Sequence, residues 1–438
     1  MDKHRIIKVF EDTQLKLNLN EQEKNDILSI RNIIGENNLI LQADGKLLIC
    51  HYVGFIHVKN TRVLIYPKIA RNVQGEDFYN KAFNILVKML AYTGFVQVKR
   101  INTPQNIARY DNDILELLIG VFVDELLSLF KRDINRSYRI TIENESFIKG
   151  KIDFTQNVKK NSYRKHLHSL IYEQFTENIL MNRIFKTVVL NLVKKTMVKE
   201  NKMKLGQALL WLEDVEQIKI TDDIWDQVTF TRLNHQYSTV FNMAKLFYHN
   251  SSINLNKGDE VTFSFLIPVN QLFERYVFKM LSCINLGKMG YTVMYQSPVR
   301  SLGYIDGKEY YKLRPDISVV KGNQVMVIFD AKYKEIIDAD GNNLVLQSDI
   351  YQMLAYSVKY NCNQIVLVYP WMLGCRNNNS ELFTIEISKG NGVLVIKVMQ
   401  IDLESDVEDV KKELSQFCQI IIEVAEQSGR LKTIKIYK

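Results

Sequence analysis

The sequence is poor in the features that mark several common classes of protein. No run of about 18 uncharged apolar residues is present, as a membrane-spanning helix would require. The charged start, MDKHRIIKVFEDTQ, lacks the apolar core of a signal peptide. The five cysteines form no CxxC pair, so neither a disulfide framework nor a zinc knuckle is indicated. These absences predict a chain of the reducing cytoplasm with no membrane contact.

Motifs for nucleotide binding and for several hydrolytic centres are also missing. There is no G-x-x-x-x-G-K-[ST] loop; ADGKLL (43–48) has only the G-K pair, so we expect no nucleotide to bind this chain. G-x-S-x-G and H-E-x-x-H are absent too. DADGNN (338–343) lacks the spacing and the distal Glu of a calcium loop, and a turn is the better interpretation.

What is present is an ordinary globular composition with a moderate excess of positive charge. The chain has 438 residues, of which 46% are hydrophobic and 24% charged, enough for two or three domains. The net charge of +8 permits nucleic-acid binding without requiring it. Basic residues cluster at 131–139, 159–168 and 194–204, and each cluster is either a phosphate contact or a solvated face.

Hydrophobic periodicity predicts a multidomain α+β and α/β protein with three regions. Residues 1–105 read as a mixed β/α region, with strands at 47–69 around a KNTR turn and an amphipathic helix at 77–94. Residues 106–265 read as mainly helical. The helical spacing there and just beyond covers 114–130, 175–193, 208–215, 237–248 and 271–284, with a strand-like interruption at 138–154.

Residues 266–438 are expected to form a separate domain with a βββαβ core. The predicted strands are 291–299, 310–320 and 325–334, followed by a helix at 349–361 and a buried strand at 364–370. A final amphipathic helix is predicted at 405–427.

Two strands of this core carry acidic residues where their apolar runs end. Asp316 follows Pro315, and Asp330 precedes Lys332 in VIFDAKYK (327–334). A short KGNQ turn makes the strands antiparallel neighbours, so the two carboxylates are expected at one rim of the sheet.

Such a rim is suited to metal-assisted hydrolysis. Asp316, Asp330 and the backbone carbonyl of Ala331 are hard oxygen ligands suited to Mg²⁺. Lys332, on the same face as Asp330, would position the attacking water or help to deprotonate it. Lys334 shares that face, with phosphate contact as its only suggested role. In the competing interpretation Asp316 ends a turn, and Asp330 and Lys332 form a surface ion pair worth under about 1 kcal/mol.

PDISVV…VIFDAKYK resembles the second and third motifs of the PD-(D/E)XK nuclease superfamily, and the βββαβ order matches the core of that superfamily. Glu274, in the helix before the first strand, resembles its helical acidic residue. Asp349, Gln352 and Tyr356 resemble the Q-x-x-x-Y element of the helix after the lysine strand. The resemblance implies metal and catalytic roles for Asp316, Asp330, Lys332 and Glu274, supported by Gln352 and Tyr356.

Further stretches resemble the McrC family, the endonuclease subunit of McrBC modification-dependent restriction systems. VLIYPKI (63–69) is similar to its N-terminal strand ending in P-K, and FIKGKIDF (147–154) to its G-K-I segment. The similarity runs from about residue 40 to residue 375. It implies a cytoplasmic defence subunit that cuts double-stranded DNA with Mg²⁺, for which Mn²⁺ would substitute. It also implies that this chain docks through its N-terminal region onto an McrB-like AAA+ GTPase ring. The ring would recognise the DNA, and the docked chain would stimulate its GTPase activity.

Two other functions stay open from the sequence. One is a stand-alone PD-(D/E)XK nuclease, such as a repair or type II restriction enzyme. The other is a non-catalytic adaptor that binds DNA or the motor ring. Cleavage by the purified chain alone would favour a stand-alone nuclease over a subunit. Loss of cleavage on changing Asp330 and Lys332 would favour a nuclease over a non-catalytic adaptor.

Overall fold

A computed structural model describes residues 5–18, 20–58, 61–71, 78–93, 113–254, 262–336, 345–373, 381–389 and 392–436. The chain divides into two compact units. Unit 1 consists of Met1–Thr93 and Ser252–Lys438, and unit 2 of Gly94–Ser251. The ends of the chain therefore belong to one unit, and the middle of the chain forms the other.

The N-terminal part of unit 1 is built on a five-stranded sheet. Its strand order is β1 (Arg5–Phe10), β6 (Thr61–Tyr66), β5 (Tyr52–Val58), β11 (Thr262–Pro268) and β10 (Ser251–Asn254). Helix α1 (Glu21–Ile34) packs on it through Ile27 and Ile30. The remaining elements are β2 (Leu15–Lys16), β3 (Leu39–Leu41), β4 (Lys46–Ile49), the short helix η1 (Lys68–Ala70) and α2 (Phe78–Tyr92). The strands and the helix predicted here are confirmed; Lys59 and Asn60 of the KNTR turn lie outside the described residues.

Strand β11 joins this sheet from far along the sequence. It pairs antiparallel with β5, and the two backbones approach closely at Gly54, where a Cβ atom would lie 2.0 Å from the Phe265 carbonyl oxygen. Gly54 also has a φ of +134°, which side-chain-bearing residues rarely adopt. The boundary expected at residue 265 falls within β11, so strand pairing continues across that position.

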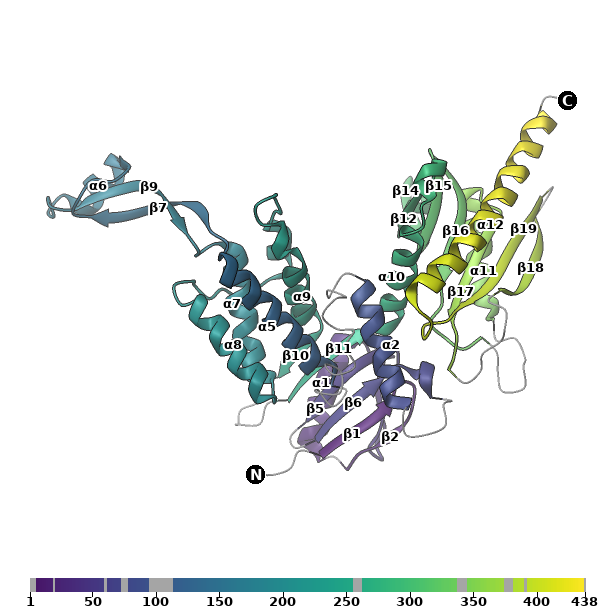
Figure 1. Ribbon diagram of the computed structural model, residues 1–438, viewed down its shortest axis with the longest axis horizontal. Coiled ribbons are helices and arrows are strands. Elements are labelled where there is room, and N and C mark those ends of the chain that lie inside the picture. Colours follow the sequence, from purple (N-terminus) through teal and green to yellow (C-terminus); the bar gives the residue numbers. More distant parts are fainter. Residues whose placement is uncertain are drawn as a thin grey trace. The chain divides into compact units, whose positions relative to one another are not determined.

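A six-stranded sheet forms the C-terminal part of unit 1 (Figure 1). Its order is β12 (Thr292–Tyr295), β15 (Ile317–Lys321), β16 (Gln324–Ala331), β17 (Gln364–Pro370), β19 (Gly392–Ile401) and β18 (Glu381–Lys389). Strands β15 and β16 are antiparallel, whereas β17 lies parallel to β16 after the crossover helix α11 (Gln347–Tyr360). The three strands, the helix and the following strand occur in the predicted order.

Three details of the sequence interpretation were wrong. Residues 310–313 do not belong to the Asp316 strand; they lie in β14 (Lys308–Leu313), which forms a separate hairpin with β13 (Arg300–Ile305). Strand β16 ends at Ala331, so Lys332 and Lys334 follow the strand. Strands β18 and β19 were not predicted, although β19 carries a dense run of β-favouring apolar residues, GVLVIKVMQI.

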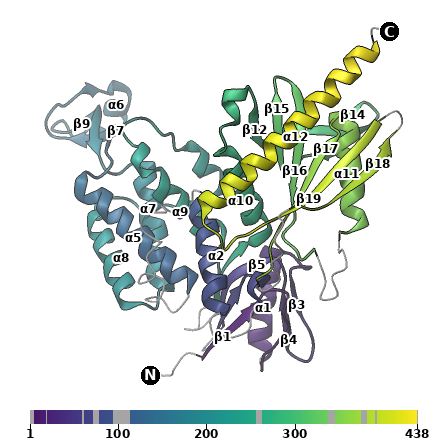
Figure 2. The same ribbon diagram turned by 45° about the vertical axis from the view of Figure 1, so that its right-hand side comes forward.

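Helices cover both faces of this sheet. Ile328 of β16 packs with Met353 and Tyr356 of α11 in one core cluster. Val327 and Phe329 alternate with Ile328 and point to the other face, and helices α10 (Val269–Ser282) and α12 (Val407–Ile436) contact β16. In Figures 1 and 2 the long helix α12 crosses the strands. The short helix η4 (Leu286–Met289) precedes β12.

Unit 2 is a helical group with a projecting β-hairpin (Figures 1 and 2). Its helices are α5 (Ile114–Arg132), α7 (Leu180–Lys195), α8 (Lys199–Trp211) and α9 (Ser238–His249), with η2 (Asp222–Gln227) and η3 (His235–Tyr237). The hairpin contains β7 (Ser137–Glu145), β8 (Lys151–Ile152), α6 (Phe154–Asn161) and β9 (His168–Thr176). Residues 175–176, predicted as helix, belong to β9, and the helix expected at 208–215 begins earlier and ends at Trp211.

The hairpin exposes large apolar side chains, whereas some of the basic residues of unit 2 are paired. Tyr138, Ile140 and Ile142 alternate along one face of β7 and are 69%, 66% and 58% exposed. Lys204 forms ion pairs with Asp124 and Glu200. The basic clusters at 131–139, 159–168 and 194–204 all lie in this unit. Within the parts of the chain that the structure describes, no helix is long and apolar enough to cross a membrane.

Candidate functional site

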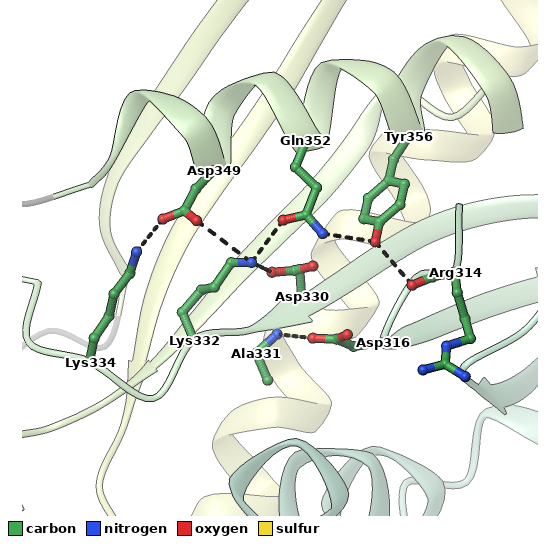
Figure 3. A network of polar contacts seen from close by, with 9 residues as sticks. All are labelled: Arg314, Asp316, Asp330, Ala331, Lys332, Lys334, Asp349, Gln352 and Tyr356. Atoms are coloured by element: carbon green, nitrogen blue, oxygen red, sulfur yellow. Dashed lines mark hydrogen bonds and ion pairs between the residues drawn. The ribbon is translucent and has the colours of Figure 1, made fainter. Parts of the chain in front are cut away.

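The two predicted aspartates lie side by side where β15 begins and β16 ends. Ile317 pairs with Phe329, which brings Asp316 and Asp330 to the same rim of the sheet. The Ala331 amide donates a hydrogen bond of 2.9 Å to Asp316 Oδ2 and thereby orients that carboxylate (Figure 3). Asp330 is only 1% exposed. The proximity predicted from the PD and D-x-K motifs is confirmed.

Lys332 is held over this rim by three side chains. Its Nζ lies 2.6 Å from Asp330 Oδ2, 2.9 Å from Gln352 Oε1 and 3.7 Å from Asp349 Oδ1. Gln352 in turn donates to the Tyr356 hydroxyl at 3.0 Å, and that hydroxyl donates to the Arg314 carbonyl at 3.0 Å. Figure 3 shows this chain of contacts running from α11 to the segment before Asp316. Gln352 and Tyr356 therefore help to hold the Lys332 ammonium group in place.

Lys334 lies on the same side as Lys332 and forms an ion pair with Asp349 (Figure 3). The sequence suggested only phosphate contact for Lys334. The structure instead shows that it neutralises an acidic residue of α11 that also faces Lys332. Because Asp349 is shared between two lysines, it balances the positive charge of the segment that follows β16.

Glu274 approaches the aspartates from α10, and a residue that the sequence interpretation missed holds it there. Gln296 Nε2 donates to Glu274 Oε1 at 2.8 Å, and the Gln296 amide donates to the Asp316 carbonyl at 2.8 Å. Gln296 adopts a φ of +47°, in the left-handed region that a glutamine seldom occupies. A lone glutamine after a strand gives no sequence signal, since its partner lies on another element.

Burial and like charges dominate the electrostatics of the site. Burial, reinforced by Asp330 and Glu274, raises the pKa of Asp316 to about 8. Burial also raises the pKa of Asp330, although Lys332 opposes this shift. Burial disfavours the charge on Lys332, but Asp330, Asp349 and Asp316 outweigh it, so its pKa is raised above the ordinary value. The amine is therefore held as an ammonium ion.

The donor set fits a divalent cation. Asp330 Oδ1 is buried and has no hydrogen-bond partner among the described residues, and Asp316 and Glu274 add negative charge beside it. Within the same residues, the one set of three carboxylate, imidazole or thiolate ligand atoms lying within 4.8 Å of one another is Glu11, Asp12 and His51. Glu274, Asp316 and Asp330 therefore do not all bring ligand atoms within 4.8 Å of one another, and Glu274 acts on Asp316 through its charge.

Comparison with known proteins agrees with this architecture. Residues 47–370 match the model of a family described as "McrBC 5-methylcytosine restriction system component". No protein of curated function matches the sequence. Its several sheets make the chain a mixed α/β protein, and this match makes it a component of a restriction system. It belongs to the McrBC 5-methylcytosine restriction system component family.

One solved structure shows the same fold, and a second match is weaker. One is described as a refined half-complex from a tetradecameric assembly of Thermococcus gammatolerans McrB AAA+ hexamers with bound McrC. It matches with a TM-score of 0.63 and 20% identity, over 94% of this chain and 100% of the matched chain. Another is the cryo-EM structure of the Thermococcus gammatolerans McrBC complex, with a TM-score of 0.47 and 21% identity over 64% and 88% of the two chains.

The raised pKa of Asp316 predicts a specific pH dependence of stability. Between its ordinary pKa of 3.8 and about 8, the folded protein retains a proton that the unfolded chain has lost. The free energy of unfolding should therefore fall as the pH rises through this window when EDTA removes divalent cations. Glu11, whose pKa is raised to about 7, contributes in the same direction in every variant that retains it.

The measurement is the Tm in EDTA from about pH 5 to about pH 8, for the wild type and for Asp316→Asn. We expect the wild-type Tm to fall more steeply, because the amide cannot titrate. Parallel curves for the two proteins would contradict the electrostatic account of the site.

Proposed function

We propose that this chain is the DNA endonuclease subunit of an McrBC-like restriction system, hydrolysing phosphodiester bonds with Mg²⁺ and acting with an AAA+ GTPase. The convergence of Asp316, Asp330 and the Lys332 ammonium at one buried sheet rim carries the proposal. In this interpretation the strands β12, β15 and β16 with α11 and β17 form a PD-(D/E)XK core. Family membership supports the restriction context, and the site geometry supports the chemistry.

The residues divide the work as follows. Asp316, Asp330 and the Ala331 carbonyl would hold Mg²⁺, Glu274 would add a ligand or orient one, and Gln296 holds the Glu274 carboxylate. The bound cation would supply stabilisation of the negative charge that develops on the scissile phosphate. The Ala331 amide keeps the Asp316 carboxylate aimed at the rim. Mn²⁺ is expected to substitute, because it accepts the same oxygen ligands.

Lys332 would act as a cation rather than as a base. Its raised pKa keeps the amine protonated at neutral pH, so it is suited to orient the attacking water and to donate to a phosphate oxygen. Gln352 and Tyr356 fix the position of Nζ. Of the two roles that the sequence left open for this lysine, water positioning is the one we propose.

Cleavage assays on isosteric variants test the site. Asp330→Asn and Lys332→Met should each lower Mg²⁺-dependent cleavage of modified plasmid DNA by about a thousandfold, because each removes a charge used in the transition state. Asp409→Asn and Lys412→Met, both exposed on α12, are matched controls that should cleave like the wild type. Assays are run with the AAA+ partner and GTP, and with the chain alone.

Each outcome separates two functions. Undiminished cleavage by both site variants would refute the assignment of Asp330 and Lys332. Cleavage by the chain alone would indicate a stand-alone nuclease. Stimulation of the partner GTPase with no cleavage by the wild type would indicate an adaptor.

Contact with the AAA+ partner is assigned to the N-terminal region, as the family resemblance implies, and the hairpin of unit 2 offers a second contact. Tyr138, Ile140 and Ile142 form an exposed apolar row on β7, and Phe175 of β9 packs beside Tyr138 with ring centroids 5.1 Å apart. Exposed apolar patches of this kind mark protein interaction sites. Because the chain belongs to the McrBC family, the AAA+ ring is the partner that we propose for this apolar row.

Surface variants distinguish the two contacts. Ile140→Ser with Ile142→Ser on the hairpin, and Ile6→Ser with Ile40→Ser on the N-terminal region, each remove exposed apolar area without touching the core. Each pair should weaken GTPase stimulation by about tenfold or more if its surface docks on the ring. A pair that stimulates like the wild type excludes its surface from the interface.

A further inference from the structure

Tyr333 stands between the two lysines of the site but points away from them. Its side chain is 5% exposed, and its ring packs against Phe273 of α10 with centroids 5.7 Å apart. The Nζ atom of Lys68, from the N-terminal part of unit 1, lies 5.5 Å from the centroid of the same ring. Lys332 and Lys334 face Asp349, so successive residues of this segment contact α11 and the N-terminal part alternately.

Beneath Tyr333 lies a buried charged cluster of the N-terminal part. Glu11 has no exposed surface, and its Oε1 accepts a 3.2 Å hydrogen bond from the Lys68 amide. Lys68 Nζ forms an ion pair with Asp12 Oδ2 at 2.6 Å. Burial raises the pKa of Glu11 to about 7. Burial is the main cause of the raised pKa of Tyr333, and the Glu11 carboxylate raises it further. The Tyr333 hydroxyl and Glu11 therefore interact electrostatically.

A metal ion is a weaker explanation for this cluster. Glu11, Asp12 and His51 bring ligand atoms within 4.8 Å of one another. However, Lys68 already places a positive charge on Asp12, so a cation would have to displace the ammonium group. The Glu11 Oε2 atom and the Tyr333 hydroxyl are both buried, and neither forms a hydrogen bond within the described residues. Each is therefore a buried polar group in need of a partner, and the electrostatic interaction between Glu11 and Tyr333 makes them partners for one another.

Two more contacts tie the same pieces together. Arg71, just after η1, forms an ion pair with Glu335, two residues beyond Tyr333. The Leu373 amide, after β17, donates to the Ile69 carbonyl at 2.8 Å. The segment from Lys68 to Arg71 therefore contacts the chain after both β16 and β17, the strands that flank the site.

The N-terminal sheet also supports the other side of the site. Strand β11 belongs to that sheet and leads directly into α10, whose Glu274 faces the aspartates. The Val269 amide at the start of α10 donates to the His51 carbonyl at 2.9 Å. The sheet thus holds the lysine segment at one side and the Glu274 helix at the other.

We propose that Glu11 and Tyr333 form a positioning contact through which the N-terminal part of unit 1 sets the place of the Lys332 ammonium. Tyr333 and Lys332 share a peptide bond, and the Lys332 amide donates to the Val368 carbonyl at 2.8 Å, so the buried tyrosine and β17 together fix the lysine backbone. A partner bound to the N-terminal region would act on the nuclease site along this route. That consequence for cleavage rests on the function proposed above, whereas the positioning itself does not.

The test uses Glu11→Gln, Tyr333→Phe and the double variant in the full chain. Tyr79→Phe is a matched control, because its hydroxyl donates to the Lys8 carbonyl in the same N-terminal part, away from the site. The first measurement is the rate at which N-hydroxysuccinimide acetate acetylates Lys332, followed by peptide mass spectrometry. We expect both single variants to raise this rate by about tenfold, and the double variant to raise it no further. Tyr79→Phe should leave it unchanged.

The second measurement is single-turnover cleavage with saturating DNA and Mg²⁺. Each single variant should lower the rate by about tenfold with DNA affinity unchanged, and the two effects should not add. Acetylation rates equal to wild type in both single variants would overturn the proposal. Additive effects in the double variant would also overturn it, because they would show two independent structural losses. If the wild type does not cleave DNA, the acetylation result still decides the positioning.

Discussion

The candidate site depends on the ion pair between Asp330 and Lys332 at the end of β16. A carboxylate that is 1% exposed is unfavourable in its charged form unless a cation stands beside it. Lys332 provides that cation at 2.6 Å, but Asp316 and Glu274 add further negative charge nearby. The balance stays negative at the rim, which explains why the pKa of Asp316 is raised and supports our proposal of a divalent cation there. The same pair keeps the lysine charged.

This arrangement persists because rigid elements hold both partners. Asp330 is fixed by pairing of β16 on two sides, with β15 and with β17. Lys332 lies just beyond the strand, where its amide still donates to the Val368 carbonyl of β17 at 2.8 Å. Gln352 and Tyr356 hold its side chain from α11, while the neighbouring Tyr333 is buried against the N-terminal part. A segment held through its backbone, and from both sides through its side chains, can position the ammonium group tightly.

Local sequence patterns were sufficient for the core of the site and insufficient for its surroundings. The apolar run after Asp316, the apolar run before Asp330 and the short turn between the two runs determine an antiparallel pair, so the proximity of the carboxylates followed from the sequence. Gln352 and Tyr356 are four residues apart, which places them on one helix face. By contrast, Gln296, Tyr333 and Lys334 work through partners on other elements, and β11 pairs with β5 across some two hundred residues. Periodicity indicates that a strand exists, but it does not identify the strand's neighbour.

Direct measurement of cation binding tests whether the buried charge at this rim makes a divalent-cation site. Mn²⁺ binding to the full chain can be followed by the electron paramagnetic resonance signal of the free ion, for the wild type, Asp330→Asn and the control Asp409→Asn. We expect a bound Mn²⁺ ion in the wild type and in the control, which Mg²⁺ displaces and which Asp330→Asn does not bind. Equal Mn²⁺ binding by all three proteins would show that this rim does not hold the cation.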